Sequence, residues 1–161
     1  MKLDWQKQVI ASSGYLELGM FEEAARSLDE ISSEDKGRME VLAARLQLYM
    51  TIGKWDMAAA VARHLVEIEA ERPEWWINLA YSSRRSESIE DAEAILLRAR
   101  DIHPTNAVIA FNLACYASVT GRIEEAKERL KHAISLDKEI RELAVCDEDL
   151  RGLRDWIASL E

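Results

Sequence analysis

The sequence is poor in the residues that mark several common protein classes. It has only two cysteines and two prolines in 161 residues. Cys115 and Cys146 lack the spacing of a metal site, and we expect two reduced, mostly buried thiols rather than a disulfide. No stretch rich in Pro, Gly or Ser divides the chain, so its length suits one domain.

Positive charge is also scarce, since 21 Lys and Arg stand against 30 Asp and Glu, a net charge of −9. Phosphate binding needs clustered Lys and Arg, so we expect no nucleic acid partner and no docking on an anionic membrane. No segment approaches the ~18 continuous apolar residues of a membrane span. The first residues lack the apolar stretch of a signal peptide, so a cytoplasmic location is expected.

Residue patterns that carry chemistry are missing as well. The three histidines, His64, His103 and His132, have no second ligand at zinc-site spacing. The chain has no Gly-rich phosphate loop and no Gly-x-Ser-x-Gly turn. Acid pairs such as Glu124-Glu125 recur near the start of a predicted helix, where they favour the helix dipole. We therefore expect no enzyme activity, no cofactor and no metal.

What the sequence does have is a repeat with a period of 34 residues. Ala24, Ala58, Ala92 and Ala126 are each 34 residues apart. The same step relates Gly19 to Gly53, and two further steps lead to Gly121. Between these marks apolar residues recur at three- and four-residue steps, which predicts helices and no strand. The expected helices span residues 3–18, 21–31, 38–52, 55–70, 74–86, 89–101, 106–120 and 123–136.

This pattern resembles the tetratricopeptide repeat. The fourth unit carries it best, with Leu113-Ala114-Cys-Tyr116 followed by Gly121 and Ala126. The resemblance implies an all-α fold: an α-solenoid of four helical hairpins, wound as a right-handed superhelix, with a C-terminal cap. The expected parts are a repeat region at 1–137 (hairpins at about 5–36, 39–70, 73–104 and 107–137) and a cap at 138–161. The cap also resembles the closing segment of small bacterial tetratricopeptide proteins.

Two positions depart from the family pattern in ways that predict local differences. Glu87 replaces the turn glycine of the third unit, which predicts a longer or looser turn there. After residue 137 the repeat register fails, and the apolar spacing instead predicts a short helix followed by a longer one. Outside the groove, Glu93 is assigned to an outer face and its removal is expected to have little effect.

In this family the first helix of each hairpin lines an inner groove that holds other proteins. The resemblance places eight residues of the third and fourth units there: Ile77, Asn78, Tyr81, Arg84, Arg85, Phe111, Asn112 and Cys115. In the second unit the corresponding slots hold Ala43, Ala44, Gln47, Met50 and Thr51. The slots of the family's carboxylate clamp, which grips acidic C-terminal tails, hold no Lys or Arg in this chain.

Two questions about these side chains stay open at the sequence level. Asn78 and Asn112 can either hold the backbone of a bound segment or bond their own scaffold or water. Arg84 and Arg85 can either pair with an acidic group of a partner or remain solvated.

The function that follows is a non-catalytic scaffold that binds a peptide or protein segment in its concave groove. The alternatives are a self-associating adaptor that forms a homo-oligomer, a small secretion-type chaperone, and a regulatory subunit of an enzyme. The partner is expected to be another protein, and the sequence does not identify it.

Overall fold

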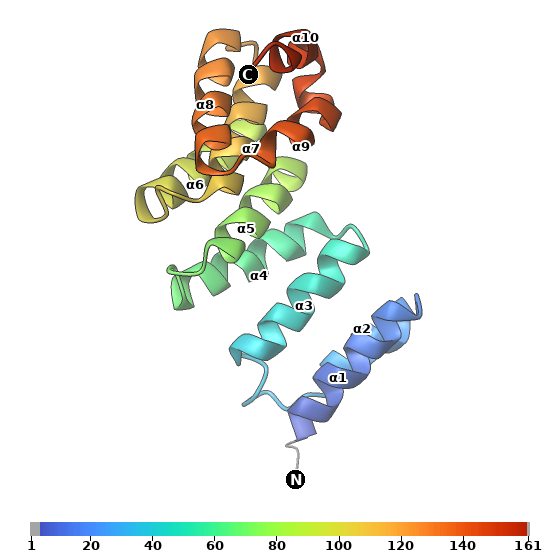
Figure 1. Cartoon of the computed structure of the whole chain (residues 1–161). Coiled ribbons are helices and arrows are strands. Elements are labelled where there is room, and N and C mark those ends of the chain that lie inside the picture. The colour runs from blue at the N-terminus through green and yellow to red at the C-terminus, as the bar shows by residue number, and fades with distance from the viewer. Residues whose placement is uncertain (1–3, 161) are drawn as a thin grey trace. The chain divides into compact units, whose positions relative to one another are not determined.

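The computed structural model describes residues 4–160, and within that range it contains helices and no strand (Figure 1). The helices are α1 (Asp4–Glu17), α2 (Phe21–Asp29), α3 (Met39–Thr51), α4 (Trp55–Ile68), α5 (Pro73–Ser86), α6 (Ile89–Ile102), α7 (Ala107–Val119), α8 (Ile123–Leu136), α9 (Ile140–Cys146), the 3₁₀ helix η1 (Glu148–Leu153) and α10 (Arg154–Ala158). The prediction of an all-α fold and of eight repeat helices is confirmed; the expected start at residue 3 lies outside the described residues. None of the described helices combines the length and the apolar character needed to cross a bilayer.

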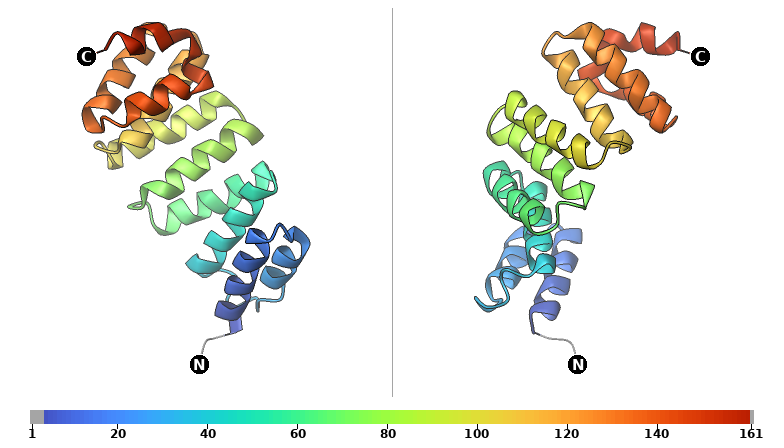
Figure 2. Two further views of the ribbon diagram at one scale, coloured as in Figure 1. Left: turned by 45° about the vertical axis from the view of Figure 1, so that its right-hand side comes forward. Right: turned by 90° about the vertical axis from the view of Figure 1, so that its left-hand side faces the viewer.

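The chain forms two compact units, Met1–Ser88 and Ile89–Glu161, called unit 1 and unit 2 below. In unit 1, α1 pairs with α2, α3 pairs with α4, α4 packs on α5, and α3 also contacts α1 and α2. In unit 2, α7 pairs with α8 and also contacts α6, α9 and η1 (Figure 2). The sequence predicts one domain, but the boundary between the units falls inside the third predicted hairpin.

Three of the helix-to-helix turns share one backbone geometry. Gly19, Gly53 and Gly121 have φ angles of 71°, 72° and 79°, a left-handed conformation that glycine adopts at low cost. In each turn the next residue closes the helix end with a hydrogen bond to the carbonyl five residues back; Arg122 N–H, for example, donates to Ala117 O at 2.9 Å. This is the Schellman arrangement that ends a helix sharply.

The turn at Glu87 is different, but it is not longer as predicted: two residues separate α5 from α6, whereas three separate the helices at each glycine turn. Glu87 has φ −121° and ψ −102°, and its N–H donates to Ser83 O in the ordinary helical manner. A side chain at this position disfavours the left-handed conformation, so the Schellman closure is not formed. The boundary between units 1 and 2 follows one residue later, at Ser88.

The repeated alanines lie in the cores of the two units. Ala24, Ala58, Ala92 and Ala126 are all fully buried. In unit 1, Ala24 belongs to a cluster with Trp5, Leu28, Ile31, Val41 and Leu48. Because a methyl group lets two helix backbones approach closely, the alanine column is the sequence feature that sets the hairpin spacing.

The C-terminal segment closes one side of unit 2. Ile140 of α9, Leu150 and Leu153 of η1 and Ile157 of α10 are buried, and η1 packs on α7. The expected short helix is present as α9, but the longer helix predicted after it is replaced by η1 and the five-residue α10. Asp147 explains this break, because its carboxylate accepts a hydrogen bond from Asp149 N–H at 2.9 Å and starts η1.

Glu93 has partners that the sequence interpretation missed. Its carboxylate accepts two hydrogen bonds from Arg122, at 3.0 and 2.7 Å, and one from Arg129 at 2.7 Å. Only 14% of the Glu93 side chain is exposed. The expectation of an inert outer-face residue therefore has to be corrected, because this carboxylate joins α6 to two arginines of the α8 region.

We expect Glu93→Gln to destabilise unit 2 by about 1 kcal/mol at pH 7, because charged hydrogen bonds are lost. Burial alone would raise the pKa of Glu93, but the hydrogen bonds and charges of Arg122 and Arg129 outweigh it and lower the pKa below 4.5. A lowered pKa gives stability that is present above pH 4.5 and lost as the pH falls through the folded-state value. Urea unfolding of the variant and the wild type should therefore differ less in acid than at pH 7.

The control for this experiment is Glu90→Gln, an exposed residue on the same helix. It removes the same charge without breaking the contacts to Arg122 and Arg129. Equal destabilisation by both substitutions, or a difference that grows as the pH falls, would contradict the assignment.

Candidate functional site

Unit 1 carries two adjoining hollows, which are lined by the first helix of each hairpin: α1, α3 and α5. One, of about 340 Å³, lies between α1 and α3, and the other, of about 410 Å³, lies between α3 and α5. They share Ala43 and Gln47 of α3. We call this combined surface the inner groove. Its lining residues are Val9, Ser12, Ser13, Leu16, Glu40, Ala43, Ala44, Leu46, Gln47, Met50, Thr51, Trp75 and Asn78.

The groove surface of α3 follows from helical spacing. All five slots that the family resemblance indicates in the second unit, Ala43, Ala44, Gln47, Met50 and Thr51, line one hollow or both. Residues three, four and seven apart share one face of a helix, so these slots form a continuous stripe. Small side chains at Ala43 and Ala44 leave the space that the hollow occupies.

Three polar side chains that line the inner groove lack hydrogen-bond partners among the described residues. The side-chain amides of Gln47 and Asn78 make no hydrogen bond to any described residue. Ser12 is fully buried, and its Oγ has no hydrogen-bond partner among those residues. Gln47 is exposed and Asn78 is half-buried, so these two amides offer donors and acceptors to a molecule lying in the groove, whereas the buried Ser12 Oγ does not. The Asn78 amide therefore does not bond its own scaffold among the described residues, which was one of the alternatives left open by the sequence.

On the exposed side of α5, Tyr81 and Arg85 form a stack with Trp55 of α4. The Arg85 guanidinium carbon lies 3.4 Å from the centre of the Tyr81 ring and 5.1 Å from that of Trp55. Tyr81 remains 42% exposed, whereas Ile77 and Arg84 are half-buried. Trp55 is absent from the sequence-based site. The extended cation–aromatic contact was not predicted.

In unit 2 two of the predicted site residues of α7 are buried, and Cys115 lies beside Asp147 and Asp149 at the start of η1. Phe111 is 8% exposed and Cys115 is 3% exposed. One helical turn further on, Ser118 Oγ donates to Asp149 O of η1 at 2.8 Å. Asn112 is half-buried, and its amide has no hydrogen bond to the described residues. The chain's own segment thus occupies the face of α7 that the resemblance assigns to a partner.

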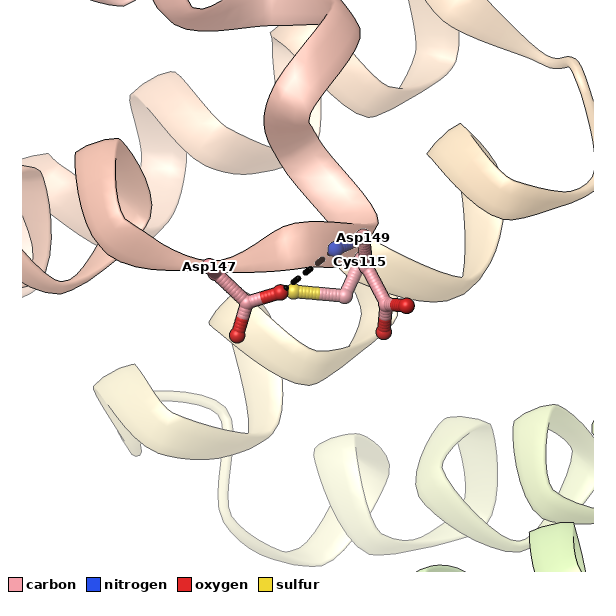
Figure 3. Close-up of side chains that lie close together, drawn as sticks. All are labelled: Cys115, Asp147 and Asp149. Atoms are coloured by element: carbon pink, nitrogen blue, oxygen red, sulfur yellow. Dashed lines mark hydrogen bonds between the residues drawn. The ribbon is translucent and has the colours of Figure 1, made fainter.

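Cys115, Asp147 and Asp149 form the one cluster among the described residues with metal-type side chains close together (Figure 3). Their ligand atoms all lie within 4.8 Å of one another. The start of η1 accounts for this arrangement, since Asp147 accepts from Asp149 N–H. Cys115 and Cys146 are not joined by a disulfide; Cys115 is buried as predicted, but Cys146 is exposed rather than buried.

Comparison with known proteins supports the repeat assignment. A model of the tetratricopeptide repeat matches residues 107–140. The Lipopolysaccharide assembly protein B of Escherichia coli (strain K12) is 22% identical over 157 residues, which cover 91% of this chain and 40% of that protein. The chain therefore spans about two fifths of the length of the curated relatives that it matches.

Solved structures agree on the fold. A crystal structure of MamA aligns with a TM-score of 0.76 at 19% identity, covering 96% of this chain and 86% of that one. The MamA of Desulfovibrio magneticus RS-1 aligns with a TM-score of 0.73 at 18% identity, covering 98% and 93%. Tetratricopeptide repeats generally mediate protein–protein interactions. The 34-residue period, the paired helices and these matches show that the chain has the tetratricopeptide-repeat fold, with a repeat matched directly at residues 107–140.

Proposed function

We propose that this protein is a non-catalytic scaffold that binds an extended segment of another protein in the inner groove of unit 1. The observation that carries the proposal is the pair of adjoining hollows with unpaired amides at Gln47 and Asn78. An amide donates and accepts at once, so it can bond a peptide backbone whatever its side chains. The apolar walls, Leu16 and Met50 among them, provide area for burial.

The proposed site includes only some of the eight residues that the family resemblance suggests. Asn78 lines the groove itself, and Tyr81 and Arg85 lie further along the same helix. Phe111 and Cys115 are both buried, and Cys115 contributes to binding only if the start of η1 leaves α7, which would expose the buried Leu150 and Leu153. Asn112 is the remaining α7 position at which a bound segment finds an unpaired amide.

The test uses a phage-displayed library of random peptides, selected on the full chain. We expect Asn78→Ala to weaken the selected peptides by about 1–3 kcal/mol, because a buried peptide group loses its partner. Affinities are measured by isothermal titration calorimetry, and Asn112→Ala reports whether the segment also reaches α7.

The control is Arg26→Ala, an exposed position on α2 that lines neither hollow. It should leave both the affinity and the melting temperature unchanged. Peptides that bind Asn78→Ala and the wild type equally well would rule out the inner groove. Self-association through another face would then become the better explanation.

A further inference from the structure

Arg85 is an exposed cation that stacks on an aromatic ring and forms no ion pair with a described carboxylate. One face of its guanidinium lies on the Tyr81 ring, and its Nη1 donates to Tyr81 O at 3.0 Å. The Trp55 and Tyr81 rings meet edge to face, with centres 5.7 Å apart and an interplanar angle of 67°. These contacts hold the arginine in one place, so a ligand that binds it meets a pre-oriented group.

The hydrogen-bonding edge of Arg85 is still available. A guanidinium has five N–H donors, and stacking uses its face rather than its edge. The acidic residue nearest in sequence, Glu87, pairs instead with Arg63 at 3.2 Å. In an acidic chain whose other arginines often have acidic partners, an arginine fixed by aromatic rings and lacking a carboxylate fits an acidic group from outside.

The position of Arg85 relates it to the inner groove. Asn78, Tyr81 and Arg85 are three and four residues apart, so they share one face of α5. On the other side of the groove, Thr51 lines the same hollow as Asn78 and precedes Trp55 by four residues. Along the face of α5 that carries Asn78, the stack therefore lies further toward the C-terminal end of the helix.

We infer that Arg85 binds the carboxylate of an Asp or Glu side chain in the segment held by the inner groove. This inference rests on the proposed function and adds the chemistry of the partner. Seven residues of helix separate Asn78 from Arg85, a rise of about 10 Å. An extended peptide covers that distance in about three residues. The acidic residue should thus lie about three positions from the residue whose backbone Asn78 bonds.

The test begins with the peptides selected on the full chain, and its first arm needs no protein variant. Each peptide is resynthesised with its acidic residue changed from Glu to Gln, and both forms are titrated with the wild-type protein. We expect the Gln form to bind about tenfold more weakly, because a charged bidentate hydrogen bond is lost. The affinity of the Glu form should also fall as NaCl is raised.

The second arm completes a double-mutant cycle with Arg85→Gln. The variant should bind the Glu and Gln peptides with affinities within about twofold of each other, because their common partner is gone. Arg26→Gln removes an equal charge from unit 1 away from the groove, and it should discriminate between the peptides as the wild type does. Melting temperatures and circular dichroism verify that Arg85→Gln is folded.

The outcomes separate the two proposals. Peptides that depend on Asn78 but tolerate the Glu-to-Gln change would overturn the role of Arg85 and leave the groove in place. Peptides that do not depend on Asn78 would overturn the groove and this inference with it. A phosphoserine peptide that binds wild type more than tenfold tighter than the Glu peptide would assign Arg85 to phosphate instead of a carboxylate.

Discussion

Leu150→Ala should destabilise unit 2 by about 2–5 kcal/mol, the usual cost of removing a fully buried leucine side chain. Leu150 is completely buried where η1 packs on α7. The loss of stability has two parts: the favourable transfer free energy of the removed methyl groups is lost, and a cavity is left beneath η1. Urea unfolding followed by circular dichroism gives the change in free energy.

The same C-terminal segment supplies a matched control in Leu143→Ala. Leu143 lies on α9 with 55% of its surface exposed, so its truncation should cost little. A second readout is the labelling rate of the Cys115 thiol in a Cys146→Ser background. Because η1 covers α7, Leu150→Ala should speed this labelling, whereas Leu143→Ala should not. If both leucine variants unfold alike, the segment is not part of the core of unit 2.

Ala126→Leu should destabilise unit 2 by about 1–3 kcal/mol, through overpacking rather than through a cavity. Ala126 is fully buried on α8, the helix that pairs with α7. A leucine there either forces its own side chain into a strained rotamer or pushes the two helices apart. The measurement is the denaturant midpoint of the variant against that of wild type.

Ala94→Leu is the matched control for this substitution, because Ala94 is exposed on α6. It introduces the same side chain where there is room for it. Unchanged midpoints for both variants would mean that the alanine column does not mark a close helix contact.

The helices were predictable because their signals are local and repeated. Apolar spacing, the alanine column and the turn glycines each recur, and the described helix bounds agree with expectation to within one or two residues. The cap was less predictable, since no repeat constrains it. There a single side chain, Asp147, decides where α9 gives way to η1.

The site was predictable only where position on a helix decides exposure. The family resemblance, applied at helical spacing, places Gln47 and Asn78 on the groove stripe. It does not reveal that Cys115 lies beside Asp147 and Asp149, because that contact joins residues more than thirty positions apart. The contact between Arg85 and the Trp55 ring joins α5 to the start of α4, and no sequence pattern predicts such a contact.

The Schellman turns at Gly19, Gly53 and Gly121 have a consequence for how such chains change in evolution. Each turn is closed by hydrogen bonds between its own backbone groups. A hairpin joined in this way needs nothing from its neighbours to set its turn, so it can be duplicated or deleted as a block of 34 residues. The turn at Glu87 lacks that closure, yet the 34-residue step from Ala58 through Ala92 to Ala126 continues across it.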